Sequence, residues 1–350
     1  MSVESEQGIT ACATVVEARA AFRRKVALSV LGGLAVTCIL GFVLVGRRHE
    51  FVTALHSAPL TLVGVAVVLQ IVALLARTEA WLVSVRAAGG LVGRRLLFRA
   101  AGVGYLASVV NGSLGMAARI ASLRRAAPER SPRVPALLAA EVPILTVEVA
   151  LAAIFSFTLI SPLGVAWWIP AIAVALMAAV VIGLRRLSER HRRGLWAGIA
   201  VMRKKARWRL IAFTLAAVCA QVARNWLMLH AIGENVSIFD AMALLIAMFT
   251  LGQLPIGPSI GPAAAVLILG SHGVAASAAA GVLLAVSGMM GSICYATWAL
   301  ADRLITGRLS PSPAILTPTP AMSQPLPAIV PALGLTRLAV NRSGMPWRRA

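Results

Sequence analysis

Charged side chains are scarce in this 350-residue sequence: 13% of its residues are Asp, Glu, Lys or Arg, against roughly a quarter in a soluble domain. Acidic residues are the rarest of these, with 12 Asp and Glu against 33 Lys and Arg, so the formal net charge is +21. Hydrophobic residues make up 59% of the chain, and the mean hydropathy is +0.86. This composition excludes a soluble α/β enzyme, a disulfide-stapled secreted module and a disordered basic protein, because none of them carries repeated uncharged stretches of about 20 residues, the length that crosses a bilayer.

Residues suited to metal binding or catalysis are also few. The four cysteines, Cys12, Cys38, Cys219 and Cys294, stand singly, and neither they nor the five histidines form a pair at metal-ligand spacing. The sequence therefore predicts no disulfide framework, no metal site and no cofactor. Basic residues do not alternate with aromatic ones, so nucleic acid is not an expected partner. Paired catalytic carboxylates and a nucleophile beside a base are lacking, and we do not expect an enzyme.

The basic residues, almost all of them Arg, lie in short runs between apolar segments, which is a membrane-topology signal. Apolar segments of spanning length are 26–45, 60–76, 134–160, 164–184, 210–231 and 274–300. The positive-inside rule places every basic residue except Arg47, Arg48 and Arg224 on the cytoplasmic side. We therefore expect a multi-pass protein of the plasma membrane with both termini in the cytoplasm.

Two more apolar segments, 96–116 and 241–270, have centres rich in Gly, Pro and small polar residues. Treating 96–116 as a full span would move the next basic loop outside, against the rule. Both segments are therefore predicted to be re-entrant hairpins, the first entering from the cytoplasm and the second from outside. The predicted fold class is an all-α polytopic membrane protein with about six full spans plus two re-entrant helical hairpins, about eight hydrophobic segments in all.

The two halves of the chain resemble each other at an offset of about 146 residues. Residues 113–118 match 259–264, and 73–77 match 220–224. The repeat halves, about 26–160 and about 163–300, begin on opposite sides of the membrane, so the sequence predicts an inverted-topology repeat. Such folds place a substrate site near the midplane where the halves meet, and broken helices mark it. Membrane transport is therefore the expected class of function.

Three regions follow from this pattern. Residues 1–25 are predicted to be a cytoplasmic N-terminal segment, 26–305 the transmembrane domain, and 306–350 a Pro-rich, disordered cytoplasmic tail. The most basic stretch, 185–209, holds ten Lys or Arg and is expected to lie near anionic headgroups as a solvated loop. Membrane lipids are thus the expected partners. The sequence leaves the oligomeric state open, a homo-oligomer included.

Several candidate residues lie in the broken segments and the spans beside them. The first segment and the span after it contain Asn111, Gly112, Gly115, Arg119 and Glu141; the second segment contains Pro255, Gly257 and Gly261. This pattern resembles the transmembrane region of lysylphosphatidylglycerol synthases and the related flippase-like integral membrane proteins, over about 26–305. The resemblance implies that a phospholipid or similar amphiphile is moved between leaflets. The soluble aminoacyl transferase domain of the synthases is absent. Acidic residues of the family pattern near Met116 and Ala263 are missing.

Charges inside apolar spans are the other candidates. An intramembrane Arg costs at least about 2.5–3.5 kcal/mol on insertion scales, so Arg224 should face a cavity or a partner such as a lipid phosphate. The alternatives are an ion pair with Glu148 or Glu141, or a side chain that extends to the membrane interface. Glu141 and Glu148 lie one heptad apart and either couple transport to protons or pair with Arg77 or Arg224. Arg77 is expected at the cytoplasmic end of its span.

The hairpin tips complete the predicted substrate site. Asn111, Ser113 and Gly115 in one hairpin, with Pro255, Gly257, Ser259 and Gly261 in the other, are expected to bind or gate an anionic headgroup through free backbone N–H groups. The alternative is that these glycines only let helices pack closely. Two other functions stay open: a non-transporting partner that regulates envelope lipid synthesis, and a membrane enzyme acting on lipid phosphates.

Overall fold

The structure is a computed structural model that describes residues 31–39, 41–109, 112–190, 194–233, 236–252, 259–270 and 273–309. Within these ranges the chain is helical and contains no β-strand. Five helices are long and apolar enough to cross a membrane, or up to six if the helical residues 31–45 and α2 (Arg48–Ser57), bent by 102°, form one span. The predicted all-helical membrane class is confirmed at this level.

The elements follow in this order after α2: α3 (Leu60–Ala87), α4 (Arg94–Ser108), α5 (Gly112–Ala126), α6 (Val134–Ala139), α7 (Val142–Phe155), the 3-10 helix η1 (Ser156–Leu159), α8 (Ile160–Leu163), α9 (Trp168–Arg190), the 3-10 helix η2 (Gly194–Arg203), α10 (Arg207–Ala231), α11 (Ile238–Leu251), α12 (Ile260–Leu269) and α13 (Val274–Leu309). The long apolar helices are α3, α9, α10, α13 and the run from α6 to α8.

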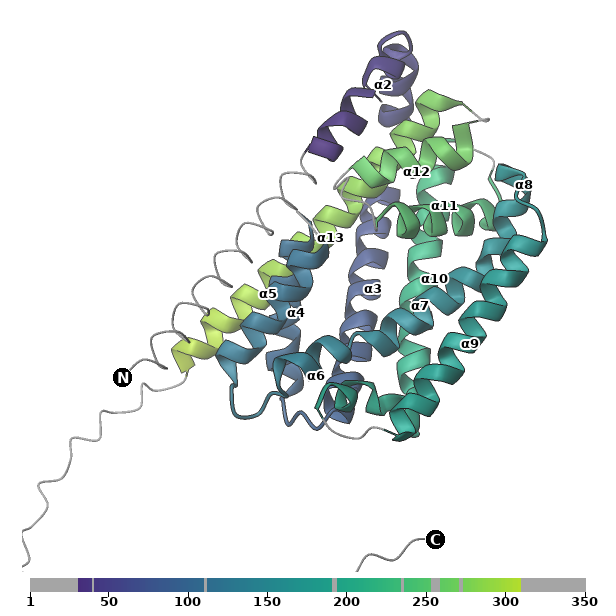
Figure 1. Ribbon diagram of the computed structural model, residues 1–350. Coiled ribbons are helices and arrows are strands. Elements are labelled where there is room, and N and C mark those ends of the chain that lie inside the picture. The colour runs from purple at the N-terminus through teal and green to yellow at the C-terminus, as the bar shows by residue number, and fades with distance from the viewer. Residues whose placement is uncertain are drawn as a thin grey trace, which may run out of the picture. The chain divides into compact units, whose positions relative to one another are not determined.

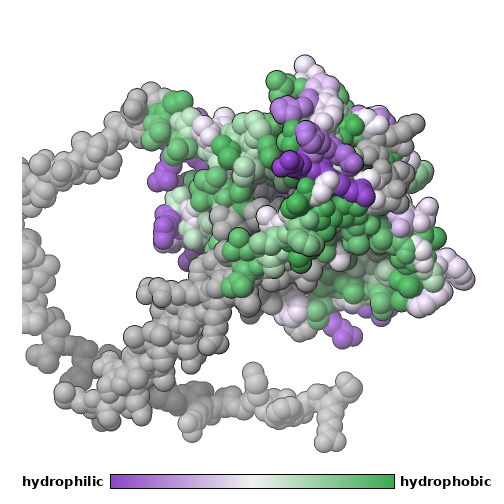
Figure 2. Space-filling view, turned by 90° about the horizontal axis from the view of Figure 1, so that it is seen from above, coloured by the Kyte–Doolittle hydropathy of each residue, from purple (hydrophilic) through white to green (hydrophobic). Residues whose placement is uncertain are grey.

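The outer surface carries large hydrophobic side chains. Leu60 on α3, Leu176 on α9 and Leu304 on α13 are exposed, and hydrophobic residues cover much of the face seen in Figure 2. Exposed tryptophans lie at the start of α9, at Trp168, and at the start of α10, at Trp208. Apolar flanks with tryptophans near helix ends are typical of contact with lipid and its interface.

The helices α3 and α10 lie side by side and antiparallel (Figure 1). Near one end the Lys204 Nζ, just before α10, donates to the Ala87 carbonyl oxygen at 3.0 Å; further along, Arg224 on α10 contacts Gln70 on α3. We call the Ala87 end of this pair the basic end. The 91–94 and 124–133 connections lie at this end too, because the Leu91 N–H donates to the Arg130 carbonyl oxygen at 3.0 Å and Arg94 pairs with Glu79. Asp302 also lies there, in contact with Arg95.

The α4–α5 pair is a tight helical hairpin. A methyl group on Gly104 would meet the Gly115 carbonyl oxygen at 2.9 Å, and one on Gly115 would meet the Ser108 Cβ at 2.6 Å. The backbones of the two helices are therefore in direct contact. The start of α4 and the end of α5 lie at the basic end, and the end of α4 and the start of α5 lie away from it.

The α11–α12 pair is arranged the other way round. Its outer ends pack with the far end of the molecule: Val236, just before α11, and Leu269 at the end of α12 share a buried cluster with Leu229 and Ala231 of α10. Capping of α11 by Ser237, whose hydroxyl accepts from the Asp240 backbone N–H at 3.3 Å, defines where this pair begins. The two helix pairs thus enter from opposite ends of the α3–α10 pair.

Three element boundaries differ from the sequence prediction. Helix α3 continues to Ala87 instead of ending at residue 76, so Arg77 lies well inside it. The 134–160 segment is broken at 140–141 because Pro143 follows and fixes a new helix start. Within the basic 185–209 stretch, residues 194–203 form η2 instead of a solvated loop: Val201 is fully buried, and Gly198 packs against the Ala136 carbonyl oxygen of α6.

Candidate functional site

An ion pair joins α3 to α7 inside the helix bundle. The Arg77 Nη2 lies 2.9 Å from the Glu148 Oε2; the carboxylate side chain is 10% exposed and the guanidinium side chain 37% exposed. The open alternative from the sequence is thereby resolved: Glu148 pairs with Arg77 and not with Arg224. Part of the Arg77 side chain therefore stays uncovered beside its ion pair.

The Arg77–Glu148 pair forms the charged part of a pocket with about 420 Å³ of empty space. The pocket lies between α3, α7, α10 and α11, and most of its wall is apolar. Its other lining residues are Leu151, Ala152, Phe155, Val218, Gln221, Leu245, Ile246 and Phe249. The α7 residues recur at the spacing of one helix face, which explains how a single helix presents both Glu148 and its apolar neighbours. The arrangement combines one charged pair with hydrocarbon-like walls.

A second ion pair is buried next to an indole. Arg119 of α5 pairs with Glu141, both less than 10% exposed, and its guanidinium carbon lies 4.2 Å from the centre of the Trp81 ring. Glu141 stands at the break before α7, where Pro143 restarts the helix and the helix N-terminus favours a carboxylate. Arg119 is predicted in the substrate site, and its contacts tie α5 to α3 and to the start of α7.

A chain of buried hydroxyl groups lies beside this pair and was not predicted. The Thr78 and Tyr105 hydroxyls are 3.1 Å apart, and the Tyr295 hydroxyl donates to Thr78 Oγ1 at 3.3 Å. The rings of Tyr105 and Tyr295 meet edge to face, with centroids 5.4 Å apart. The sequence has two tyrosines in all. That scarcity, together with their positions in apolar segments, is the signal that would have identified them.

Arg224 is buried in α10, at 5% exposure, but its partners are neutral. Its guanidinium donates to the Gln70 side-chain oxygen of α3 and, at 3.4 Å, to the Asn225 side-chain oxygen. It also lies close to α13: a methyl group added to Gly288 would be 3.3 Å from the Arg224 Nη1. The expected pairing of Arg224 with Glu148 or Glu141 is wrong, because those carboxylates bind Arg77 and Arg119. Among the described residues, no carboxylate pairs with it.

The predicted hairpin-tip residues are only partly described. Asn111, Pro255 and Gly257 lie outside the described residues, and Ser113 belongs to the first turn of α5. Ser259 is buried at the start of α12. A methyl group on Gly261 would meet the Gly281 carbonyl oxygen of α13 at 2.7 Å, just as Gly115 meets α4. Close packing thus accounts for both glycines, as the alternative interpretation holds.

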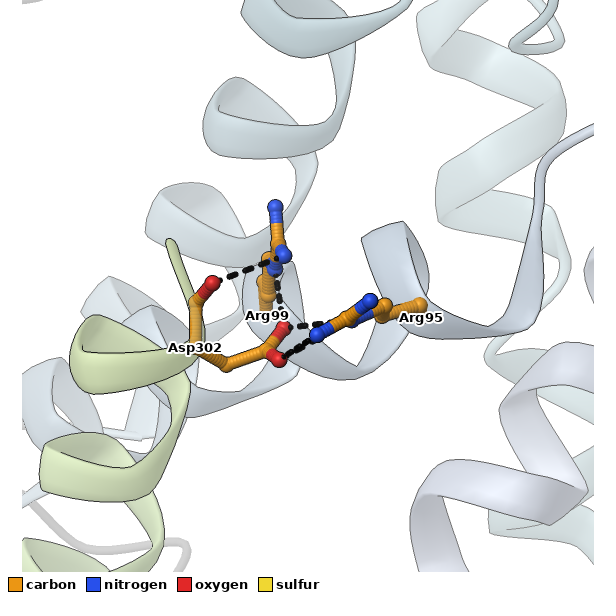
Figure 3. Close-up of polar contacts among 3 residues, drawn as sticks. All are labelled: Arg95, Arg99 and Asp302. Carbon is orange, nitrogen blue, oxygen red and sulfur yellow. Dashed lines mark hydrogen bonds and ion pairs between the residues drawn. The ribbon is translucent and has the colours of Figure 1, made fainter. Parts of the chain in front are cut away.

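At the basic end, Asp302 of α13 joins two arginines of α4 (Figure 3). The Arg95 Nε donates to both carboxylate oxygens at 2.9 Å, and Arg99 donates to one of them and, at 3.0 Å, to the Asp302 carbonyl oxygen. The hydrogen bonds that Arg95 donates to Asp302, and the negative charge of that carboxylate, raise the pKa of Arg95 above its usual value. This contact fixes the first turns of α4 against α13.

In the described ranges, no three His, Cys, Asp or Glu side chains lie close enough together to hold a metal ion. Comparison with protein-family models, with curated proteins and with solved structures gives no significant match.

Proposed function

We propose that this protein moves a phospholipid or other lipid-linked amphiphile between the leaflets of a membrane. The observation that carries the proposal is the pocket in which a partly accessible Arg77, paired with Glu148, faces apolar walls from four helices. Its polar and apolar parts match the two parts of an amphiphile. The resemblance of the sequence to flippase-like membrane proteins points the same way.

The charges explain how a headgroup would be accepted. A charge at membrane depth is costly, so Arg77 needs an anionic partner at all times. Glu148 provides one in the resting state. A lipid phosphate is geometrically equivalent to a carboxylate for the planar guanidinium fork and can share or replace Glu148, while the acyl chains stay beside the apolar wall. Exchange of one anion for another avoids leaving a buried unpaired cation at any step.

The inverted repeat is part of the proposal. The antiparallel packing of α3 against α10 supports it, as do the two helix pairs, α4–α5 and α11–α12, which enter from opposite ends. Matching glycines make close backbone contacts, Gly115 of α5 with α4 and Gly261 of α12 with α13. In transporters built from such repeats, the substrate site lies where the halves meet. The pocket with Arg77 is lined by helices from both halves.

We place the basic end in the cytoplasm and propose six full spans, two re-entrant hairpins and a plasma-membrane location. Arginine-rich connections remain on the cytoplasmic side during insertion. The packing of the 87–94, 124–133 and 203–209 connections at one end of the α3–α10 pair supports this orientation.

The test is a leaflet-resolved assay on purified protein in liposomes that contain fluorescent anionic and zwitterionic lipids. We expect movement of at least one lipid class, and at least a tenfold loss of rate in Arg77→Gln. Arg125→Gln is the matched control, because Arg125 is exposed on α5 and away from the pocket. If the wild-type protein moves no lipid, transport is the wrong function. Chemical conversion of the lipid would then indicate an enzyme. If the lipid is neither moved nor converted, the protein is better explained as a regulatory partner in envelope lipid synthesis.

A further inference from the structure

A second and larger pocket opens at the basic end. It has about 1010 Å³ of empty space and lies between the last turns of α3, the start of α4 and the junction of η2 with α10. Its lining residues are Glu79, Leu82, Val83, Arg86, Ala87, Arg94, Lys204, Ala206, Arg209 and Phe213. None of these belongs to the pocket that holds Arg77 and Glu148.

The helices explain why these residues meet. On α3, residues 79, 82, 83 and 86 follow the i, i+3, i+4, i+7 spacing of one helix face, and on α10 residues 206, 209 and 213 share a face as well. Gly89, with φ of 93°, ends α3 in a conformation that favours glycine. This turn brings Arg94, at the start of α4, back onto Glu79.

Positive charge exceeds negative charge in this pocket. Four cations, Arg86, Arg94, Lys204 and Arg209, face one carboxylate, that of Glu79. Arg94 pairs with Glu79, and Lys204 Nζ donates to the Ala87 carbonyl oxygen at 3.0 Å, which fixes its ammonium group at the end of α3. In the described part of the chain, Arg86 and Arg209 pair with no carboxylate. Three cations therefore remain without a counter-charge.

Part of the lining is apolar: Leu82, Val83 and Phe213 line the same pocket as the cations. A free inorganic anion needs only the charges, whereas a lipid gains from the charged and the apolar lining. A phosphodiester headgroup brings a single negative charge, but a phosphomonoester carries about −1.5 to −2 at pH 7 and offers three acceptor oxygens. Three uncompensated cations match the second group better.

We propose that this pocket binds the phosphomonoester or diphosphate headgroup of a lipid at the basic end, with the start of the lipid tail against Leu82, Val83 and Phe213. The inference rests on the proposed function, because it names the class of lipid that the transporter would receive at this pocket. Binding itself does not require transport, so the two can fail independently.

The experiment measures binding by the purified full-length protein in detergent to short-chain phosphatidic acid, short-chain phosphatidylglycerol and inorganic phosphate. We expect phosphatidic acid to bind at least tenfold more tightly than phosphatidylglycerol, and inorganic phosphate to bind more weakly than both. Arg86→Gln and Arg209→Gln should each weaken phosphatidic acid binding about tenfold, while Arg209→Lys keeps most of it. Arg125→Gln is the control and should bind as the wild type does.

Equal affinity for the monoester and the diester lipid would overturn the proposal. Binding of inorganic phosphate as tightly as phosphatidic acid would overturn it too, because the tail would then contribute nothing. Thermal unfolding of each variant shows whether it is folded, and both arginines are exposed, so their replacement should leave the fold intact. If Arg86→Gln loses phosphatidic acid binding but still moves lipid, this site is separate from the transport route. If the wild-type protein binds phosphatidic acid tightly but moves no lipid, only the proposed function is refuted.

Discussion

Arg224 on α10 donates a hydrogen bond to the Gln70 side chain on α3, so a buried cation at the contact of these two helices is held by a neutral amide. Two other arginines inside the helix bundle, the partly exposed Arg77 and the buried Arg119, each have a carboxylate. A buried charge without a counter-charge carries a desolvation cost of several kcal/mol that its neighbours offset only in part. Among the described residues, Arg224 is therefore the buried arginine whose charge is least compensated.

The first prediction concerns this contact. Gln70→Glu should raise the melting temperature, because a carboxylate replaces the neutral partner and a charged hydrogen bond contributes about 1.5–3 kcal/mol. The same change should slow lipid movement, since the new carboxylate occupies the guanidinium. Arg224→Gln should keep the fold but lower the rate at least tenfold. Unchanged transport in Arg224→Gln would remove this arginine from the route.

The second prediction concerns the Arg77–Glu148 pair. Glu148→Gln leaves Arg77 without its anion and should lower the free energy of unfolding by about 1–3 kcal/mol, less than for a fully buried pair because Arg77 is partly accessible to solvent. The double variant Arg77→Gln with Glu148→Gln should recover part of this loss. Thermal unfolding of the wild type, both single variants and the double variant measures the coupling. Additive losses would show that the pair is not coupled.

The third prediction separates packing from binding at the hairpin glycines. Gly115→Ala should destabilise the protein by about 1–3 kcal/mol, because the added methyl group overlaps Ser108 and the Gly104 backbone. Gly112→Ala on the same helix is the matched control, since nothing lies within 4 Å of its added methyl group. Melting temperatures of the two variants decide the question. Equal stability would mean that α4 and α5 are not packed this closely.

The fourth prediction tests the direction of the helices. In a variant whose four cysteines are replaced by serine, Leu91→Cys at the basic end should react with a membrane-impermeant maleimide from the cytoplasmic side only. Phe239→Cys at the start of α11 should react from the outer side only. Both positions are exposed in the structure. Labelling of both from one side would contradict the proposed topology.

The long helices and their alternating directions were predictable because apolar length and runs of arginine are properties of the sequence alone. The full length of α3 was not. Arg77, Glu79 and Arg86 look like the start of a loop, yet Arg77 and Glu79 have partners, Glu148 and Arg94, on other helices. Those partners make charges acceptable inside the helix, and a single sequence does not show which segments will meet.

The candidate site was predictable in its residue types but not in its pairings. The sequence offered two glutamates and several arginines; which of them pair depends on the break at Pro143 and on the position of α3 against α7. Thr78 and Gln70 were missed because an isolated polar residue in an apolar segment is usually unremarkable. Their roles depend on neighbours distant in the chain, Tyr105 and Tyr295 for one and Arg224 for the other.

The contact between Gly104 and Gly115 has a mechanical consequence. Two helices whose backbones touch without intervening side chains cannot slide or separate without losing that contact, so α4 and α5 form a single stiff unit. This unit is tied to the rest of the protein at its base, where the Leu91 N–H donates to the Arg130 carbonyl oxygen and Asp302 of α13 holds Arg95 and Arg99. Any substitution that loosens one helix of the unit should therefore disturb the other.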